Sequence, residues 1–222
     1  MRTFAISDIH GCAHTFEAML SGVIHFKKDD TLYLLGDYID RGPRSKEVLD
    51  IIMGLQSRGY NVHALKGNHE EICLNSFNTK DSLNAWLING GDATLKSFSA
   101  EAPYQIPQQY ISFMEELELY KELENYLLVH AGFNFDTDDP FADKRAMLWT
   151  RHFTVKGNKI VVHGHTPTIR QKIEEAVVNA AENKSIDIDN GCAYSYRGEE
   201  YGSLCCLQLD NLQLHFQKNI DF

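Results

Sequence analysis

Several features that mark secreted or membrane-spanning chains are scarce or missing in this sequence. Only five of 222 residues are proline, and no Pro- or Ser-rich linker divides the chain. No apolar run approaches the roughly 18 residues that a membrane-spanning helix needs. Asp8 comes too early for the apolar core of a signal peptide. We therefore expect one cytoplasmic domain over residues 1–222.

Cysteine is also scarce, and its spacing excludes a zinc knuckle or a C-x-x-C redox pair. The five are Cys12, Cys73, Cys192, Cys205 and Cys206. An odd number without a paired pattern predicts buried, reduced thiols. The adjacent Cys205 and Cys206 lie in an apolar strand pattern, so they are predicted to point to opposite faces.

Positive charge is in deficit, with 21 Lys and Arg against 31 Asp and Glu, which gives a net charge of −10. Nucleic acids and anionic membranes are therefore not expected partners. A phosphorylated protein or a small phosphoester is still compatible, because a few well-placed cations can override the mean field. We expect a monomer or a weak oligomer.

The first seventy residues repeat one pattern, in which an apolar strand is followed by a polar loop and a helix. The strands are predicted at Arg2–Ser7, Thr31–Leu35 and Asn61–Leu65. A helix over Ser45–Arg58, with Ser45 as its cap, follows the second strand. This repetition predicts βαβ units, a largely parallel sheet and an α/β fold. Open α/β sheets bind ligands at the carboxyl ends of their strands.

The second half turns to strands after a mostly helical middle from about residue 81 to 118. A hairpin is predicted to turn near Glu124–Asn125, and a strand at Lys159–Val162 leads into a further polar loop. The segments IDIDNG and SLCCLQLDNLQLHFQ are predicted to close the chain as antiparallel strands around Asp210–Asn211. We expect this half to form a second sheet that faces the first, with helices outside.

Polar residues of a particular kind follow the predicted strands. Taken singly, each is compatible with a turn, a capped helix or a satisfied core histidine. Together they supply carboxylate, amide and imidazole ligands of the sort that hold manganese, iron or zinc. Burying them without a cation would be costly. The set consists of Asp8, His10, Asp37, Asp40, Arg41, Asn68, His69, Glu70, His130, His163 and His165.

The motifs SDIHG, GDYIDRG and GNHE, followed by HAG and GHTP, occur in an order and spacing that resembles the phosphoprotein phosphatase family of metallophosphoesterases. The resemblance covers about residues 2–195. It is strongest to bacterial and phage serine/threonine phosphatases, with symmetrical diadenosine tetraphosphate hydrolases nearby. It implies a calcineurin-like fold of two facing mixed β-sheets flanked by helices, and two divalent metal ions. Manganese is the first expectation, with iron, zinc, cobalt or nickel as alternatives.

The resemblance also implies a role for each matching residue. One metal would be held by Asp8, His10 and Asp37, and the other by Asp37, Asn68, His130 and His165. His69 would be the general acid and Asp40 would orient it. Arg41 and Arg151 would hold the phosphoryl oxygens. Lys66 and Asn68 would also bind substrate, although Lys66 stands where many protein phosphatases have arginine and lacks its bidentate fork.

These roles imply a metal-dependent phosphomonoesterase that acts on phosphoserine and phosphothreonine in proteins, with phosphotyrosine as an extension, by direct attack of a metal-bridging hydroxide. The alternative is a symmetrical diadenosine tetraphosphate hydrolase, but the retained Asp40 favours the phosphomonoesterase. A non-catalytic binding module or a nuclease fits the complete ligand set and the acidic charge less well. No Cys-x5-Arg or P-loop motif supports another phosphate chemistry.

Three further segments are predicted near the site without an assigned role. His163 would point to the same side as His165 by strand alternation, which allows a supporting contact. The segment Trp86–Gly91 is predicted to end a helix near the mouth of the site. Asp189–Gly191 would line the cleft after the IDI strand.

Overall fold

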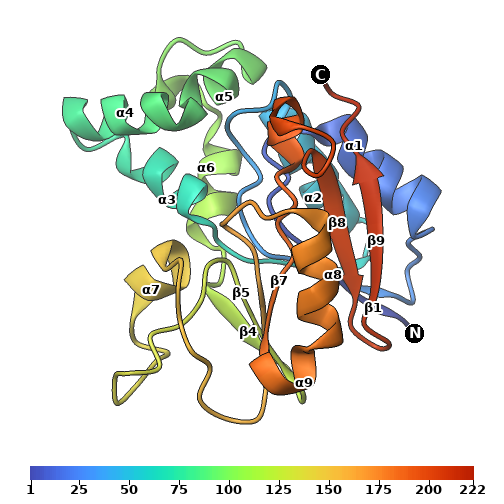
Figure 1. The fold of residues 1–222 in the computed structure, drawn as a ribbon. Helices are drawn as coiled ribbons and strands as arrows, with labels where there is room; N and C mark the ends of the chain where they lie inside the picture. Colours follow the sequence, from blue (N-terminus) through green and yellow to red (C-terminus); the bar gives the residue numbers. More distant parts are fainter.

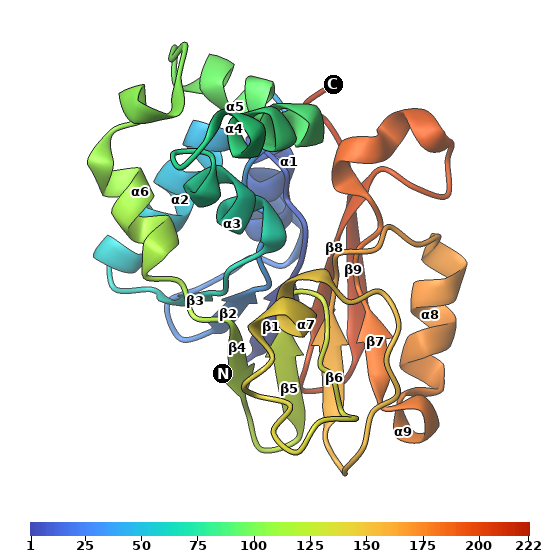
Figure 2. The ribbon, with the colours of Figure 1, turned by 90° about the vertical axis from the view of Figure 1, so that its left-hand side faces the viewer.

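Two mixed β-sheets pack face to face and helices cover their outer sides in the computed structural model, which describes all 222 residues (Figures 1 and 2). The first sheet has the order β3-β2-β1-β8-β9. Strands β1, β2 and β3 run parallel, whereas β8 is antiparallel to both β1 and β9. Its strands are β1 (Thr3–Ile6), β2 (Thr31–Leu34), β3 (Asn61–Ala64), β8 (Ser203–Gln208) and β9 (Gln213–Lys218).

The second sheet has the order β4-β5-β6-β7. The predicted hairpin at residues 124–125 joins β4 to its antiparallel neighbour β5, and β5, β6 and β7 run parallel. Its strands are β4 (Tyr120–Glu122), β5 (Tyr126–Val129), β6 (Ile160–His163) and β7 (Ser185–Asp187). The fold class and the two facing sheets are as predicted.

Two details of the predicted topology are wrong. The IDI segment forms β7, which pairs parallel with β6 rather than closing the chain as an antiparallel strand. The closing hairpin β8–β9 joins the first sheet, where Leu207 of β8 lies opposite Ala5 of β1. Both Leu207 and Ala5 are fully buried, so β1 is a central strand of the first sheet.

Strand alternation divides the apolar side chains into separate cores. Phe4 and Ile6 of β1 belong to the largest core, which packs under the helices, whereas Ala5 belongs to the core between the two sheets. Cys205 and Cys206 follow the same rule and lie in different cores, as predicted. All five cysteines are buried and unpaired by disulfides.

The outer helices follow the strands in the order that the sequence indicates. α2 buries Val48, Leu49, Ile52 and Leu55 on the face that packs against the core. The prediction that Ser45 caps α2 is wrong, because Ser45 is the first helical residue and its hydroxyl accepts the N–H of Asp40 at 3.1 Å. The helices before the second sheet are α1 (Ala13–Ala18), η1 (Met19–Val23), α2 (Ser45–Ser57), α3 (Asn68–Asn75), α4 (Lys80–Trp86), η2 (Leu87–Gly91), α5 (Asp92–Ser97), η3 (Pro103–Gln105) and α6 (Gln108–Glu115).

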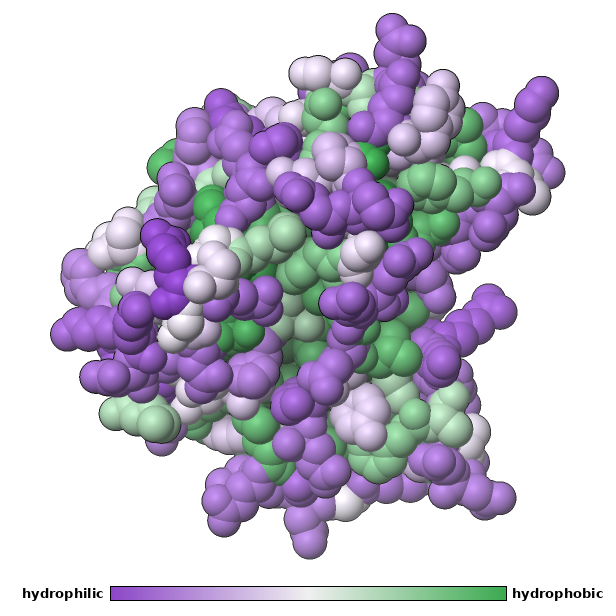
Figure 3. Space-filling model, turned by 180° about the vertical axis from the view of Figure 1, so that it is seen from behind, coloured by the Kyte–Doolittle hydropathy of each residue, from purple (hydrophilic) through white to green (hydrophobic).

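The later helices cover the second sheet and the end of the first. They are α7 (Lys144–Trp149), α8 (Arg170–Val178), α9 (Ala180–Asn183) and η4 (Cys192–Arg197). None of the helices has the length and apolar character required to cross a membrane. Seen from behind, the surface is mostly hydrophilic, with hydrophobic residues confined to small areas between polar ones (Figure 3).

The N-terminal strand is anchored by an ion pair that gives a testable contribution to stability. Asp30 accepts hydrogen bonds from the backbone and guanidinium of Arg2 and from the backbone of Lys27. Burial alone would raise the pKa of Asp30, but these bonds to Arg2 and Lys27 outweigh it and lower the pKa.

We expect Asp30→Asn to lower the free energy of unfolding by about 1.5 kcal/mol at neutral pH, because charge-assisted hydrogen bonds are lost. Because the pKa of Asp30 is lower in the folded state than in the unfolded state, the ionised carboxylate contributes its full stabilisation above the unfolded-state pKa. This stabilisation is lost as the pH falls through the folded-state pKa. Urea denaturation at pH 7 and at pH 3 measures both effects. An unchanged difference between wild type and Asp30→Asn at the two pH values would contradict this account.

Candidate functional site

The chemistry-bearing residues gather where five parallel strands end. Asp8 and His10 follow β1, Asp37 follows β2, Asn68 begins α3 after β3, and His130 and His165 follow β5 and β6. These strand ends belong to both sheets, β1, β2 and β3 to the first and β5 and β6 to the second. Ten residues other than glycine have positive φ, and six of them lie here: Asp8, His10, Asp37, Asp40, Arg41 and His165. Such backbone strain concentrates at functional sites.

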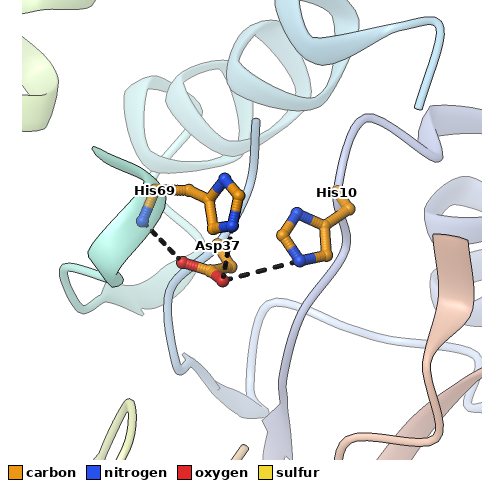
Figure 4. A group of neighbouring side chains, drawn as sticks. All are labelled: His10, Asp37 and His69. Atoms are coloured by element: carbon orange, nitrogen blue, oxygen red, sulfur yellow. Dashed lines mark hydrogen bonds and ion pairs between the residues drawn. The ribbon is translucent and has the colours of Figure 1, made fainter. Parts of the chain in front are cut away.

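Asp37 lies at the centre of the cluster, with imidazoles on both sides. Its Oδ2 is 3.5 Å from Nε2 of His10 and 3.9 Å from Nε2 of His69 (Figure 4). Its Oδ1 is 3.5 Å from Nε2 of His130. Two groups of potential ligand atoms therefore share Asp37: one contains His10 and His69, and the other contains His130 and His165. A carboxylate shared by two groups is the arrangement that the bridging role of Asp37 requires.

The second group is completed by Asn68. The side-chain oxygen of Asn68 lies 2.8 Å from His130 Nε2 and 2.8 Å from His165 Nδ1. Nδ1 of His130 is held by the backbone carbonyl of Leu35 at 2.9 Å, which leaves Nε2 directed at the cluster. A ring nitrogen bonded to a backbone carbonyl fixes the tautomer and orientation of a metal-binding histidine.

The donor set fits divalent cations. His165 Nε2 is buried and has no hydrogen-bond partner. Burial, followed by the neighbouring His130, lowers the pKa of His165 to about 3. Burial also lowers the pKa values of His10 and His130. Neutral imidazoles next to a buried carboxylate are the protonation states that bind metal.

Asp8 differs from the arrangement that the resemblance implies. Its carboxylate accepts from the hydroxyl of Ser7 and from the backbone N–H of His165 at 3.1 Å, and it is not part of the first group around Asp37. A Cβ at Gly164 would collide with Ser7 and Asp8, so this approach requires glycine. His69 takes the third place in the first group.

His69 and Asp40 form the closest imidazole–carboxylate contact in the site. Nδ1 of His69 lies 2.7 Å from Asp40 Oδ2, and both residues are buried. Burial alone would lower the pKa of His69, but the charge of Asp37 and the hydrogen bond to Asp40 outweigh it and raise the pKa. In this contact the Asp40 carboxylate fixes the orientation of the His69 ring.

Asp40 is itself fixed by two residues to which the sequence assigned no role. Trp86 Nε1 donates to both carboxylate oxygens at 3.0 Å, and the Thr94 hydroxyl donates at 2.7 Å. Both side chains are buried. The segment Trp86–Gly91 was predicted near the mouth of the site, but Trp86 lies beneath it as a support. Only the three-dimensional fold brings these residues to Asp40, 46 and 54 positions away.

We expect Trp86→Phe to lower kcat about tenfold and to cost about 2 kcal/mol of stability, because Asp40 loses a buried donor and the smaller ring leaves a cavity. Steady-state kinetics and urea denaturation measure the two effects. Thr94→Ser, which keeps a hydroxyl donor, is the matched control and is expected to retain most of the activity. A Trp86→Phe enzyme with unchanged kcat would contradict the positioning role.

Glu70 is another supporting residue that sequence reasoning did not identify as such. Its carboxylate accepts backbone N–H groups from Asp37, Tyr38 and Gly67 at 2.8–2.9 Å. These bonds tie the loop after β2 to the start of α3, where Gly67 approaches Asp37 so closely that a Cβ would collide. Burial, followed by the charge of Asp37, raises the pKa of Glu70 to about 7. In the sequence, the place of Glu70 in the GNHE motif was the signal that could have identified it as a supporting residue.

The predicted cationic residues occupy three different settings. The guanidinium of Arg41 contacts Nε2 of His10 and lies beside the metal groups. Arg151 is exposed after α7, and its charge contributes to the lowered pKa of His165. The ammonium of Lys66 donates to the backbone carbonyl of Glu115 at 3.0 Å, at the end of α6. The structure therefore brings Arg41 to the cluster but directs Lys66 elsewhere.

Two other predicted neighbours of the site can be placed. His163 does not contact His165, because its ring nitrogens face the carbonyl of Gly164 at 3.2 Å and the hydroxyl of Ser185 at 3.0 Å. Asp189 is buried, and its carboxylate accepts the N–H of Gly191 at 2.7 Å. It stabilises the loop that leads into η4.

A cup of buried histidine and aspartate side chains at the ends of parallel strands is a site built for metal-assisted hydrolysis. Residues 1–209 match the calcineurin-like phosphoesterase family, and the chain belongs to that family. The motif-based resemblance and the predicted fold are thereby confirmed. This family is one of metal-dependent hydrolases, and the two groups of potential ligand atoms around Asp37 fit that chemistry.

Named relatives carry two activities. The chain is 28% identical over 220 residues to the asymmetrical bis(5'-nucleosyl)-tetraphosphatase of Bacillus velezensis, which covers 85% of this chain and 84% of the relative. It is 30% identical over 132 residues to serine/threonine-protein phosphatase 2 of Escherichia coli, covering 59% and 58%. The sequence analysis gave symmetrical diadenosine tetraphosphate hydrolases as the alternative to a serine/threonine phosphatase, whereas the Bacillus velezensis relative is an asymmetrical one.

A solved structure shares the fold at low sequence identity. A protein serine/threonine phosphatase from Saccharomyces cerevisiae superimposes with a TM-score of 0.68 at 15% identity, covering 100% of this chain and 81% of that one. This similarity supports the arrangement of sheets and helices described above.

Proposed function

We propose that the protein is a dinuclear-metal-dependent phosphatase that hydrolyses phosphomonoesters, with phosphoserine and phosphothreonine in proteins as substrates. The observation that carries the proposal is the buried His69–Asp40 pair, with 2.7 Å between Nδ1 and Oδ2. An alkoxide released from serine or threonine is strongly basic and needs a proton as it departs. The raised pKa of His69 keeps that proton available.

The metal ligands in this proposal are the residues of the two groups, together with Asp8. Asp8, His10 and Asp37 would hold one ion, and Asp37, Asn68, His130 and His165 the other. Two divalent ions, when bound, supply Lewis-acid stabilisation of the phosphoryl oxygens and an activated water. The chain positions these ligands with backbone contacts such as His69 N–H to Asp37 Oδ1 at 3.0 Å.

The remaining roles belong to cations and the oriented acid. Arg41 would hold phosphoryl oxygens, because its planar guanidinium matches them with two donors and lies beside His10. Arg151 would add a second cation near His165. His69 would deliver its proton from Nε2, since Nδ1 faces Asp40.

The second candidate is hydrolysis of dinucleoside polyphosphates, which is favoured by the name of the Bacillus velezensis relative. The leaving group in that reaction is a phosphate, a much weaker base than an alkoxide, so it needs less help from a general acid. The well-supported His69–Asp40 pair therefore favours phosphomonoesters as the main substrates.

Product analysis separates the two candidates. The manganese-loaded protein is incubated in parallel with a phosphoserine peptide and with diadenosine tetraphosphate, and the products are identified by mass spectrometry. We expect inorganic phosphate and dephosphorylated peptide from the first substrate. Turnover of the dinucleotide alone would show that the phosphatase proposal is wrong.

A further inference from the structure

The helix α7 lies directly beside the candidate metal site. The N–H of Ala131, which follows His130 in the chain, donates to the backbone carbonyl of Met147 in α7 at 2.8 Å. The ring of Trp149, at the end of α7, lies edge-on to that of His165, with 6.3 Å between the two centroids. Figure 2 shows α7 at the carboxyl end of β5. Exposed side chains of α7 are therefore within reach of a molecule bound at the metal groups.

Three basic side chains of this segment are exposed and form no ion pair within the protein: Lys144, Arg145 and Arg151. By contrast, the next two lysines along the chain, Lys156 and Lys159, each pair with a carboxylate, at 2.7 Å and 2.9 Å. The unpaired cations belong to a chain of net charge −10, in which carboxylates outnumber basic groups. Their positive charge is available to an anionic ligand.

Two surface depressions flank α7, and Arg145 and Trp149 line both of them. The larger one, of about 660 Å³, is completed by Lys144 and Glu71. The smaller one, of about 350 Å³, is bounded mainly by residues 133–136 and 152–154. Side chains four positions apart in a helix share one face. An extended chain that leaves the metal site past Trp149 therefore meets Arg145 next.

The carboxylates that line the two depressions are already engaged. Asp143 accepts the N–H of Ala146 at 3.0 Å and caps α7. Glu71 accepts Nε1 of Trp149 at 2.9 Å. Asp136 pairs with a lysine at 2.7 Å. These contacts fix the acids and the tryptophan, and they leave the two basic groups of α7 as the free charged groups of this surface.

The spacing of these residues sets the distance between a bound phosphate and an acidic group on the same ligand. Trp149 lies 6.3 Å from His165, measured between ring centroids. Arg145 begins one turn earlier, about 6 Å further along the axis of α7. An extended peptide advances about 3.3 Å per residue. A carboxylate about three or four residues from a phosphorylated side chain therefore reaches Arg145.

We propose that the basic face of α7, formed by Lys144, Arg145 and Trp149, binds acidic residues that flank the phosphoserine or phosphothreonine of a protein substrate. The inference rests on the phosphatase activity proposed above and names acidic segments as its preferred substrates. Charge complementarity selects this occupant, because two unpaired cations attract a segment rich in carboxylates and repel a basic one. An anionic membrane is the less suitable occupant, since it would repel a chain of net charge −10.

Fluorescence anisotropy on the manganese-loaded protein measures the preference with labelled peptides that resist hydrolysis. Each peptide carries a phosphonate analogue of phosphoserine, and the third and fourth positions on both sides are all glutamate, all glutamine or all lysine. We expect the glutamate peptide to bind about tenfold more tightly than the glutamine peptide, an effect that two exposed ion pairs can supply together. The lysine peptide should bind most weakly. The preference should shrink as the salt concentration rises from about 0.05 M to about 0.3 M.

Lys144→Gln combined with Arg145→Gln is expected to reduce the preference to below about threefold, because both ion pairs are lost. Metal content and kcat on p-nitrophenyl phosphate, which has no flanking residues, should stay at wild-type values. Lys27→Gln combined with Lys172→Gln is the matched control, since it removes the same charge at two exposed lysines outside both depressions. The control is expected to keep the full preference.

Two results would overturn the proposal. One is equal binding of the glutamate and glutamine peptides by the wild type, and the other is an unchanged preference in the variant that lacks Lys144 and Arg145. Binding to phosphatidylserine vesicles that this variant loses, without any peptide preference, would also overturn it and would assign the basic face to a membrane.

The outcome is separable from that of the proposed function. A glutamate preference in the binding experiment, without hydrolysis of any phosphoserine peptide, would reject the phosphatase and keep the basic face as a site for acidic segments. Hydrolysis of the three corresponding phosphoserine peptides with equal kcat/KM, and no preference in binding, would do the reverse.

Discussion

Asp37→Asn is expected to lose both metal ions and to reduce kcat for phosphoester hydrolysis by on the order of 10³-fold or more. Asp37 is the one carboxylate shared by the two groups of ligand atoms, and it lies 3.5 Å from both His10 and His130. An amide lacks the charge and the second anionic oxygen needed to bridge two cations. Metal content per chain, by mass spectrometry of the reconstituted protein, is measured alongside kcat.

The substitution is designed to leave the fold in place. Asn keeps a carbonyl oxygen that can accept the N–H of His69, which Asp37 Oδ1 accepts at 3.0 Å. Circular dichroism and urea denaturation provide the check. Asp92→Asn, at an exposed carboxylate that pairs only with Lys96, is the matched control and is expected to retain two metals. Two fully occupied metals in Asp37→Asn would contradict the bridging assignment.

His69→Asn is expected to lower kcat for a phosphoserine peptide by about 10²- to 10⁴-fold while metal content stays near that of the wild type. The loss should be smaller with p-nitrophenyl phosphate, whose leaving group is a weak base that needs little protonation. Parallel kinetics on the two substrates, with metal analysis of the same preparation, measure the effect. The substrate difference is the signature of a general acid.

The His69→Asn variant also distinguishes between two roles of His69 that the geometry allows, general acid and metal ligand. Nε2 of His69 lies 3.9 Å from Asp37 Oδ2, within the first group of ligand atoms, and Asp8 does not belong to that group. Loss of one metal in His69→Asn, with equal losses of kcat on both substrates, would make His69 a ligand. His14→Asn, at a half-exposed ring next to Asp221, is the control for histidine removal as such.

Local sequence patterns were sufficient to predict the architecture and the strand ends. Alternation placed Cys205 and Cys206 in different cores, and the repeated strand–loop–helix pattern predicted the parallel strands β1 to β3. Patterns of this kind report which faces are buried. They do not report which strand is the neighbour, and for that reason the pairing of β8 with β1 was not predicted.

The supports of the site were outside the reach of sequence reasoning. Trp86, Thr94 and Ser45 contact Asp40 or its backbone from separate helices, and nothing in their local patterns indicates a carboxylate partner. Lys66 was predicted to bind substrate from its place before GNHE. The backbone of Leu65 instead pairs with Glu118 in an isolated bridge, and the Lys66 ammonium donates to the backbone carbonyl of Glu115 at the end of α6. In both cases, packing between residues far apart in the sequence determines which partner a side chain contacts.

Metal titration of the stripped protein tests the central claim most directly. Chelator-treated protein is titrated with Mn²⁺ while phosphate release from the phosphoserine peptide is followed. The account predicts negligible activity without metal and a plateau at two equivalents per chain, because Asp37 joins two ligand groups. Full activity in the stripped protein, or a plateau at one equivalent, would contradict it.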